Sequence, residues 1–363
     1  MRIIQVAPSL RLGGAEIMCE NLTCRLMDMG HQVTVACLFD TQSAITERLA
    51  RRGADVRFFS KRPGADLAMV GKLKRLFQEE RPDVVHTHTH VIQYAVPAAR
   101  AARVPVLVHT VHNIARLEYA GPGRLMEGFF FRRCGVVPVA LSEEIRRTVE
   151  EEYRLSASAV PVVFNGIDLS RCAVRESYGA HSPFTVIHVG RFNEQKNHRG
   201  LITAFARFRE KFPDSRLELV GDGPLRPAME ELSRELGLGD SVSFLGERSS
   251  VYELLGAADV FALPSNFEGM PMALIEAMGS ALPAAAAAVG GVPDMIEDKV
   301  SGLLTGSDPE SIAEALASLA SDAALRERLG RAALERAQRF SAAAMAESYE
   351  EIYRARLDAV RAH

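Results

Sequence analysis

Two glutamates flank the start of an expected helix in the segment PSNFEGMPMALIEAM, residues 264–278. Residues 259–263 predict a strand before it, and Pro271 is typical of the first turn of a helix. The order is therefore strand, loop, helix. At such a helix start we expect the backbone N–H groups of Gly269 and Met270 to meet an anion or hydroxyl groups. Glycine also lets a ligand approach the backbone closely.

Glu268 precedes this expected helix and Glu276 lies in its second turn. Both side chains can face the space beyond the carboxyl end of the strand, where carboxylates can accept hydrogen bonds from the hydroxyls of a ligand. The alternative is structural: Glu268 as a charge favoured by the helix dipole, and Glu276 as a solvated surface residue.

Two cations follow a second expected strand, residues 184–189. Arg191 and Lys196 come after Gly190, before a segment with apolar residues at helical spacing. Cations beyond the carboxyl end of a parallel strand can hold a diphosphate and neutralise a leaving group. Solvated loop charges are the alternative interpretation.

Two further glycine-rich turns each join a strand to a helix. Gly221 and Gly223 match a dinucleotide fingerprint only weakly, because Arg226 stands where the third glycine would be. Gly13 and Gly14 follow the first expected strand and could approach a phosphate, although such pairs are also common in ordinary turns.

Histidines alternate at positions 86, 88 and 90, which would place them on one face of a strand and suggests a metal site. No acidic residue or cysteine lies nearby in the sequence, so the pattern favours the end of a strand instead. His112 directly follows another expected strand and is the better candidate for chemistry.

Short β-rich runs alternate with amphipathic stretches along the whole chain, which predicts parallel sheets with helices on both faces. The polar stretch 161–183 is typical of a connection between domains. We therefore expect one domain over 1–168, completed by a terminal helix at about 343–363, and a second over 169–342. The expected strands are 2–7, 32–38, 55–59, 83–87, 105–110, 136–140, 184–189, 216–220, 242–245, 259–263 and 282–287.

The composition is that of an ordinary globular protein. Of 363 residues, 47% are hydrophobic and 25% charged, and the net charge of −3 offers no field for nucleic acid. The five cysteines are scattered and predict buried thiols in a reducing compartment. No stretch approaches the roughly 20 apolar residues of a membrane span. We expect a cytoplasmic protein.

Taken together and in this order, the segments resemble family 4 of the glycosyltransferases, and the resemblance runs over nearly the whole chain. It is carried by GGAE (13–16), TVH (110–112), NGID (165–168), VGR (189–191), QKN (195–197), GDGPL (221–225), the pair Glu268 and Glu276, GGVP (290–293) and YEEIY (349–353).

The resemblance implies the GT-B fold: two Rossmann-like parallel-sheet domains facing a central cleft, with the C-terminal helix crossing back to the N-terminal domain. The first domain would bind the acceptor and the second a nucleotide-sugar donor, a UDP- or GDP-sugar. The implied diphosphate ligands are Arg191 and Lys196. Glu276 would bind the ribose hydroxyls, and Glu268 the transferred sugar.

The remaining implied site residues would bind the donor through backbone groups or act beside its anomeric centre. His112 is the residue beside the anomeric centre, and the backbone contacts are Gly13, Gly14, Gly190, Gly221, Gly223, Gly269, Met270 and Pro271. Two cations and a helix start can stabilise a departing diphosphate without a metal. The resemblance therefore implies transfer with retention of anomeric configuration and no metal or other cofactor.

The acceptor is implied only as a glycan, a lipid-linked molecule or a small molecule. The stretch 129–133 together with Lys72, Lys74 and Arg75 could contact a membrane surface, or could belong to ordinary helices with charged flanks.

The sequence departs from the family pattern after Glu276. Ala281 replaces a glycine and Ala287 a threonine, in a run of alanines that predicts a loose strand and an altered nucleotide pocket. This departure motivates one alternative to the transferase, a noncatalytic sugar-binding homologue. A nucleotide-sugar epimerase is a second alternative, because it has the same fold and also binds a sugar diphosphate.

Overall fold

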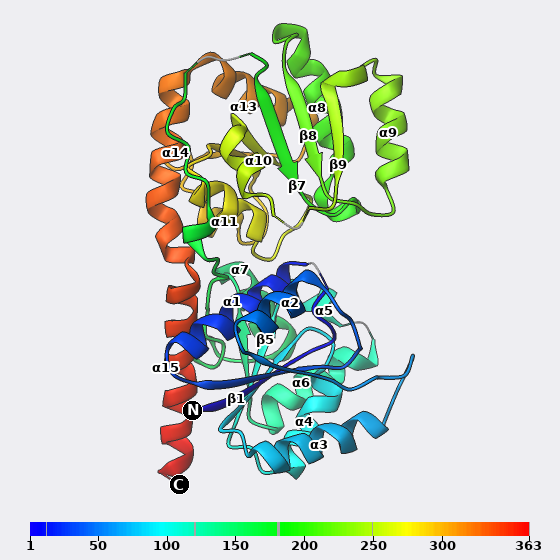
Figure 1. Cartoon of the computed structure of the whole chain (residues 1–363), viewed down its shortest axis with the longest axis vertical. Helices are drawn as coiled ribbons and strands as arrows, with labels where there is room; N and C mark the ends of the chain where they lie inside the picture. The colour runs from blue at the N-terminus through cyan, green and yellow to red at the C-terminus, as the bar shows by residue number, and fades with distance from the viewer. Residues whose placement is uncertain (12, 120, 180–181, 249, 363) are drawn as a thin grey trace. The chain divides into compact units, whose positions relative to one another are not determined.

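The computed structural model describes residues 1–11, 13–119, 121–179, 182–248 and 250–362. The chain divides into two compact units (Figure 1). Unit 1 comprises Met1–Ile167 and Ser341–His363, and unit 2 comprises Asp168–Phe340. In the described part of the chain each unit contains one six-stranded sheet, and neighbouring strands pair in parallel.

The sheet of unit 1 has the order β3-β2-β1-β4-β5-β6. Its central strands β1, β4 and β5 are buried along nearly their whole length, as expected where helices cover both faces of a parallel sheet. The buried positions include polar residues, among them Gln5, His86 and His109. The strands are β1 (Arg2–Ala7), β2 (Gln32–Cys37), β3 (Asp55–Phe58), β4 (Val84–His88), β5 (Val106–Val111) and β6 (Val136–Ala140).

The C-terminal helix α15 (Ala342–Arg361) belongs to unit 1 and packs on α1 (Gly14–Asp28). Ser341 caps it by accepting a hydrogen bond from the N–H of Ala344. Its Tyr349 and Tyr353 are fully buried. The other helices of unit 1 are α2 (Ala44–Arg51), α3 (Ala68–Glu80), α4 (Ile92–Ala101), α5 (Ala115–Glu118), α6 (Pro122–Arg133) and α7 (Glu143–Tyr153).

The sheet of unit 2 has the order β12-β11-β10-β7-β8-β9 (Figure 1). The sequence does not predict its edge strand β12, because three residues are too few to show a periodic pattern. The strands are β7 (Thr185–Val189), β8 (Arg216–Val220), β9 (Val242–Gly246), β10 (Val260–Leu263), β11 (Ala284–Ala287) and β12 (Leu303–Thr305).

Helices of unit 2 begin at side-chain caps in several places. Asn197, Asp308 and Asp322 accept hydrogen bonds from the first free N–H groups of their helices. The helices are α8 (His198–Lys211), α9 (Arg226–Glu235), α10 (Tyr252–Ala257), α11 (Met272–Gly279), α12 (Val292–Met295), α13 (Pro309–Ser321) and α14 (Ala323–Ala337).

The alanine run forms a regular strand despite the low strand propensity of alanine. Ala284, Ala285 and Ala286 pair with Phe261, Ala262 and Leu263 of β10, and the run also pairs with β12. All four alanines of β11 are buried, with α11 and α13 in contact with the strand. Tertiary packing therefore overrides the local preference.

Both sheets contain a point where the strand order reverses. In unit 1 it lies between β1 and β4, and in unit 2 between β7 and β10. Open α/β sheets bind ligands beyond the carboxyl ends of the strands at such points. Each unit therefore has a candidate site, built on the loops after these strands.

Candidate active site

In unit 2 the loops after β7 and β10 are joined by hydrogen bonds. The N–H of Asn266 donates to the carbonyl oxygen of Gln195 at 2.8 Å, and its Nδ2 donates to the carbonyl of Glu194 at 2.7 Å. β7 and β10 are neighbours in the sheet, so their loops leave the same edge. The two segments singled out in the sequence thus form one surface.

Asn197 connects these loops to a third. It has a left-handed backbone conformation with φ of 49°, which asparagine tolerates better than most residues. Its Nδ2 donates to the carbonyls of Pro264 at 3.0 Å and Ser307 at 2.8 Å, while its Oδ1 caps α8. One side chain therefore fixes the loops after β7, β10 and β12.

Lys196 and Glu268 form a largely buried ion pair on this surface. Nζ of Lys196 lies 2.6 Å from Oε1 of Glu268, and the Glu268 residue is only 3% exposed. Ser265 donates to the same oxygen at 2.6 Å, and Gln195 donates to Oε2 at 3.3 Å. Three donors from two loops hold this carboxylate in one position.

Gly290 and Gly291 support the loop that carries Glu268 from the β11 side. Gly290 has φ of 57°, and a Cβ there would overlap the carbonyl oxygen of Glu268. The N–H of Gly291 donates to the carbonyl of Gly269 at 2.9 Å. Gly290 is thus required by a close backbone approach.

Glu276 differs from Glu268 in its environment. It is 8% exposed, and burial raises its pKa from 4.5 to about 7, while the charge of Arg171 and the hydroxyl of Tyr252 act in the opposite direction. It lies on α11, on the side of Arg171 and α10. A carboxyl in this position suits hydrogen bonding to neutral hydroxyls.

Gly221 and Gly223 serve contacts between the loops after β7 and β8. A Cβ on Gly221 would overlap the carbonyl of Gly190, and one on Gly223 would meet the backbone of Phe192. Gly190 itself lies against His188 and the stem of Lys196. These three glycines therefore shape the loop that carries Lys196.

Arg191 and the residues just before α11 complete the predicted site residues of unit 2. Arg191 is exposed, and among the described residues no ion pair or side-chain hydrogen bond is found for it, so its guanidinium is available to an anion. Gly269 and Met270 are buried in the loop. Pro271 is the N-cap of α11. Proline is most common at the first helical position, so the helix begins one residue later than the sequence suggests.

In unit 1, Gly13 is the N-cap of α1 and Gly14 its first residue. A Cβ on Gly13 would lie 2.5 Å from Oε2 of Glu16, so this carboxylate folds back over the helix start. Burial raises the pKa of Glu16. The loop before Gly13 includes Leu12, which lies outside the described residues.

His112 follows β5 and is half-buried. Its Nε2 lies 3.3 Å from Nδ1 of His88, at the end of the neighbouring strand β4. The alternating histidines do not share one role: His86 hydrogen-bonds Tyr353 and Thr110, while the His90 ring lies against Tyr119.

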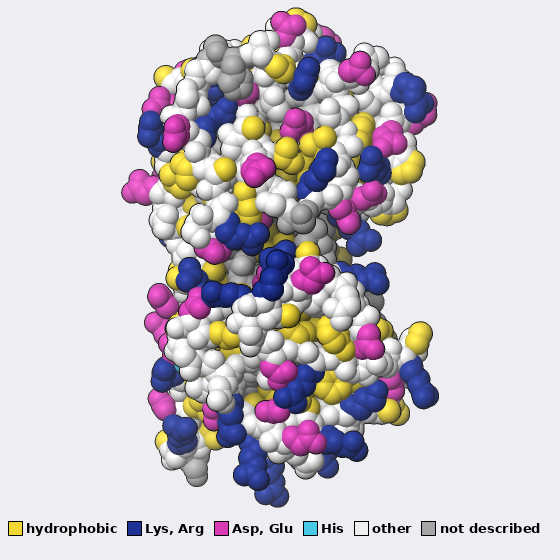
Figure 2. Space-filling view, viewed as in Figure 1, with side chains coloured by type: hydrophobic (Ala, Val, Ile, Leu, Met, Phe, Trp, Pro, Cys, Tyr) yellow, Lys and Arg dark blue, Asp and Glu magenta, His cyan; other side chains and the backbone are white. Residues whose placement is uncertain are grey.

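His86 and His88 are buried, whereas His90 is exposed, and almost no histidine colour reaches the face drawn in Figure 2. In the described ranges no group of three or more His, Cys, Asp or Glu side chains is arranged to hold a metal ion. Acidic and basic side chains are interspersed over the same face.

Sequence reasoning did not single out Ser265, Arg171 or Tyr252. Ser265 contacts Glu268 within one loop, three residues away, and a serine at a loop start could have signalled it. Arg171 lies over the Tyr252 ring, with its guanidinium carbon 4.9 Å from the ring centre. Arg171 and Tyr252 act on Glu276 from segments that are far from it in the chain, so no local pattern could have predicted this interaction.

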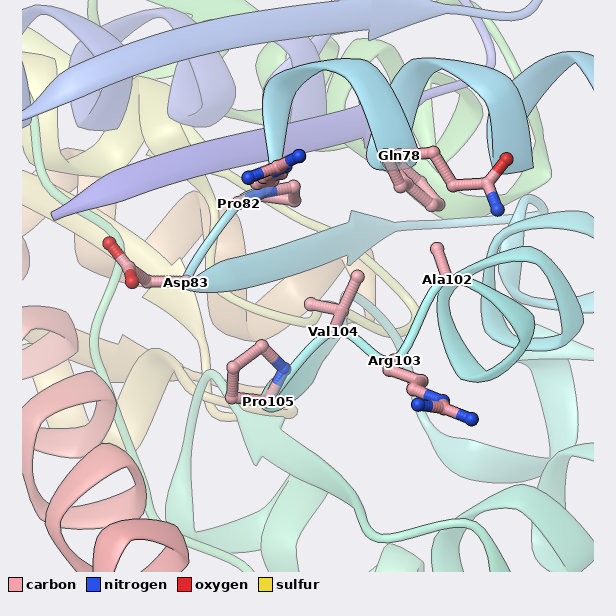
Figure 3. A pocket seen from close by; sticks show the side chains of 9 residues that line it. Gln78, Pro82, Asp83, Ala102, Arg103, Val104 and Pro105 are labelled. Carbon is pink, nitrogen blue, oxygen red and sulfur yellow. The ribbon is translucent and has the colours of Figure 1, made fainter.

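A pocket in unit 1 lies at the opposite edge of the sheet (Figure 3). Its lining residues include Pro82 and Asp83, directly before β4, and Val104 and Pro105, directly before β5. This is the amino end of the strands, away from the candidate site.

The fold and the site define an α/β protein with two doubly wound units, one of which holds a lysine–glutamate pair at its strand-order reversal. Two family descriptions match the chain: "Glycosyltransferase Family 4" over residues 12–171 and "Glycosyl transferases group 1" over residues 173–336. The chain belongs to glycosyltransferase family 4 and has the GT-B fold. It is a glycosyltransferase.

Curated relatives agree. EpsF of Bacillus subtilis, assigned to the glycosyltransferases, is 31% identical over 86% of this chain and 85% of its own length. The UDP-Gal:alpha-D-GlcNAc-diphosphoundecaprenol alpha-1,3-galactosyltransferase of Escherichia coli is 30% identical over 72% of each chain. A D-inositol 3-phosphate glycosyltransferase of Kribbella flavida is 32% identical over 71% of this chain and 68% of its own.

Solved structures share the fold. Anabaena Alr3699/HepE, crystallised with UDP and glucose, superposes with a TM-score of 0.85 at 23% identity, over 98% of this chain and all of that one. A glycosyltransferase from Rickettsia africae gives 0.82 at 17% identity, over 98% of each chain. Across the described part of this chain, no helix is long and apolar enough to cross a bilayer.

Proposed function

We propose that this glycosyltransferase takes its sugar from a nucleoside diphosphate sugar bound to unit 2, with UDP as the first choice of nucleotide. The observation that carries the proposal is the Lys196–Glu268 pair, held by hydrogen-bonded loops at the strand-order reversal. UDP in HepE and UDP-Gal in the name of the Escherichia coli relative support a uridine donor.

Each side chain has a role in this proposal. Arg191 and Lys196, with the N–H groups before α11, bind the diphosphate, where negative charge grows as the bond breaks. Glu276 accepts hydrogen bonds from the ribose hydroxyls. Glu268, oriented by Ser265 and Gln195, binds hydroxyls of the transferred sugar. His112 of unit 1 binds a hydroxyl of the sugar substrate.

The reaction we propose proceeds with retention. The bond between the anomeric carbon and the diphosphate oxygen breaks, and its electron pair leaves with the diphosphate. The sugar becomes oxocarbenium-like. The acceptor oxygen then bonds to the same face, and its proton passes to a diphosphate oxygen. The cations stabilise the departing anion, so the proposal needs no metal ion.

The test is a calorimetric titration of the protein with UDP, GDP, ADP and dTDP, followed by turnover with the sugars of the nucleotide that binds. Acceptors offered are simple glycosides, a polyprenyl-diphosphate sugar and small polyols. Proton NMR of the product then reports its anomeric configuration. We expect UDP to bind and the product to keep the configuration of the donor.

Other results would reject parts of the proposal. An inverted product would exclude the retaining reaction. Formation of an epimer from the donor without an acceptor would favour the epimerase, and binding of none of the nucleotides would favour a noncatalytic sugar-binding protein. An Arg191→Ala variant should bind the nucleotide more weakly, whereas the exposed Arg199 on α8 provides a matched control.

We also propose that α6 contacts a membrane surface when the acceptor is lipid-linked. Leu125 and Phe129, one turn apart, are 75% and 53% exposed, whereas Phe130 and Phe131 are buried. Exposed apolar residues beside arginines are typical of interfacial helices. Sedimentation with anionic vesicles should be lost in a Leu125→Ser, Phe129→Ser variant, and equal sedimentation of both proteins would reject this contact.

A further inference from the structure

A chain of hydrogen bonds crosses the strand-order reversal of unit 1. It runs from Thr23 on α1 through Gln5 on β1 and His88 on β4 to His112 after β5. β1, β4 and β5 are adjacent in the sheet, so each step joins neighbouring elements. Gln5, Thr23 and His88 are buried.

The direction of the first step is fixed by the hydroxyl of Thr23. Its Oγ1 lies 2.7 Å from the carbonyl oxygen of Cys19, which can only accept a hydrogen bond. The hydroxyl of Thr23 has one proton, and it donates this proton to the carbonyl of Cys19. Oγ1 must then accept from Gln5, whose Nε2 lies 2.6 Å away. This leaves Oε1 of Gln5 as an acceptor.

The direction of this hydrogen bond determines which ring nitrogens of His88 and His112 carry protons. Nε2 of His88 lies 2.9 Å from Oε1 of Gln5, so this ring nitrogen carries the proton. In a neutral imidazole the other nitrogen, Nδ1, is then an acceptor. Nε2 of His112, 3.3 Å away, must donate to it.

Both rings are neutral in this chain. Burial and the neighbouring histidines hold the pKa of His88 well below its ordinary value, and burial with His109 lowers that of His112 to about 3. Among the described residues no carboxylate hydrogen-bonds to either ring, so nothing there favours a charged form.

We propose that Thr23, Gln5 and His88 are positioning residues that hold His112 in the tautomer with its proton on Nε2. Its Nδ1 then carries a lone pair and accepts a hydrogen bond from a hydroxyl of a sugar substrate. His112 is half-buried, and no partner for Nδ1 is found among the described residues. That the ligand is a sugar rests on the proposed function, whereas the tautomer does not.

The consequence is selectivity in what His112 can bind. A neutral ring with a fixed lone pair favours a ligand group that donates, such as a hydroxyl, over one that only accepts. A ring free to exchange tautomers could serve either. The buried chain thus fixes the chemistry of one nitrogen on the half-buried ring of His112.

The test is nitrogen NMR of the full chain labelled with 15N in its histidines, without any ligand, at pH 8. A His112→Gln variant assigns the His112 signals. We expect Nδ1 at the shift of an unprotonated ring nitrogen and Nε2 at that of a protonated one. A protonated Nδ1 in the wild type would overturn the proposal.

Two variants interrupt the chain and a third serves as control. His88→Phe and Gln5→Met should move both His112 signals toward intermediate shifts, as the tautomers exchange. If either variant fails to fold, the other decides. His90→Asn, on the same segment but outside the chain, should leave the signals in place. Unchanged His112 signals in a folded Gln5→Met variant would reject the positioning role.

Kinetics then separates this inference from the proposed function. Gln5→Met should lower kcat/KM for the donor about tenfold, as expected for loss of one oriented hydrogen bond, while nucleotide binding to unit 2 stays at the wild-type level. If no donor is turned over by the wild type, the proposed function fails, and the NMR result still decides the tautomer.

Discussion

Nζ of Lys196 and Oε1 of Glu268 lie 2.6 Å apart, although the two residues are separated by 72 positions in the sequence. The pair neutralises a carboxylate that is almost completely buried. Arg191 is exposed on the same loop, and in the proposed function it is the cation that meets an incoming diphosphate first. We therefore expect the pair to make two separable contributions, one to the stability of unit 2 and one to the proposed catalysis.

A double-mutant cycle separates these contributions. Lys196→Met should destabilise the protein by about 3 kcal/mol, because it leaves a buried carboxylate without its cation. Adding Glu268→Gln should recover most of that loss. Transfer should fall at least about a hundredfold in Lys196→Met and stay low in the double variant, because the charge at the diphosphate is still missing.

Denaturant unfolding and steady-state turnover measure the two contributions. Arg331→Met is the control: it removes an exposed ion pair with Glu327 on α14, and should cost no more than about 0.5 kcal/mol. A stable Lys196→Met protein with wild-type turnover would contradict both assignments.

Glu276→Gln should change the pH dependence of stability. The folded pKa of Glu276 is about 7, above its ordinary 4.5, so the folded protein holds this proton more tightly than the unfolded chain. The protonated carboxyl contributes its full share of stability below pH 4.5. This contribution is lost progressively as the pH rises to 7, because the carboxyl must then ionise in a buried place. A pKa difference of this size between the folded and unfolded states corresponds to about 3 kcal/mol in the free energy of unfolding.

We thus expect Glu276→Gln to gain stability relative to the wild type as the pH rises from 4.5 to 8. Unfolding free energies of both proteins at several pH values provide the measurement, and Glu253→Gln, at an exposed position on α10, is the control. A constant difference across this range would show that Glu276 does not titrate there. In turnover, Glu276→Gln should raise the donor KM more than it lowers kcat, since the proposed ribose contacts would persist through the reaction.

Gly290→Ala should disrupt the proposed donor site. A Cβ at this position overlaps the carbonyl oxygen of Glu268, so the loop carrying Glu268 must move. Gly237 has a similar φ of 66°, but a Cβ there meets nothing within 4 Å. Gly237→Ala therefore carries the backbone strain without the clash.

Calorimetry compares nucleotide binding by Gly290→Ala and Gly237→Ala. Both should lose about 1 kcal/mol of stability through strain, and Gly290→Ala more through the clash. Weakened nucleotide binding should appear only in Gly290→Ala. Equal binding by the two variants would mean that the position of the Glu268 loop does not matter to the donor.

Much of the fold is predictable from the sequence because each strand and helix has its own local pattern. All eleven expected strands match described strands to within a few residues of their bounds, including 282–287, which contains β11. β12 was not anticipated, because three half-buried residues on an edge carry no periodic signal.

The site is predictable only in part. Lys196 and Glu268 could be named from their places after strands, but their pairing depends on β7 and β10 being neighbours, which is a property of the whole sheet. The same holds for Asn197, whose two carbonyl partners lie in loops after other strands. Tertiary contacts of this kind leave no trace in local spacing.

Transfer activity should survive chelation. The proposed chemistry stabilises the departing diphosphate with Arg191, Lys196 and backbone N–H groups, so EDTA should change the rate by less than about twofold, whereas a metal-assisted reaction would lose its main source of charge stabilisation. The measurement is turnover after dialysis against EDTA, with and without added Mn²⁺ or Mg²⁺. A loss of activity that manganese restores would replace this mechanism.

The turn after α11 ends in a Schellman motif that has alanine where glycine is usual. Ala281 has φ of 56°, its N–H donates to the carbonyl of Met278, and the N–H of Leu282 donates to the carbonyl of Ala277. A left-handed alanine costs about 1–2 kcal/mol. Ala281→Gly should relieve this strain, while losing a buried methyl worth about 0.8 kcal/mol and gaining chain entropy in the unfolded state.

These effects nearly cancel, so we expect Ala281→Gly to change the unfolding free energy by less than about 0.5 kcal/mol. Ala332→Gly, in the interior of α14 in the same unit, has no strain to relieve and should cost about 1 kcal/mol. Denaturant unfolding of both variants makes the comparison. If Ala281→Gly cost as much as Ala332→Gly, the left-handed conformation of Ala281 would be wrong, and with it the explanation of how this turn accommodates an alanine before the buried strand β11.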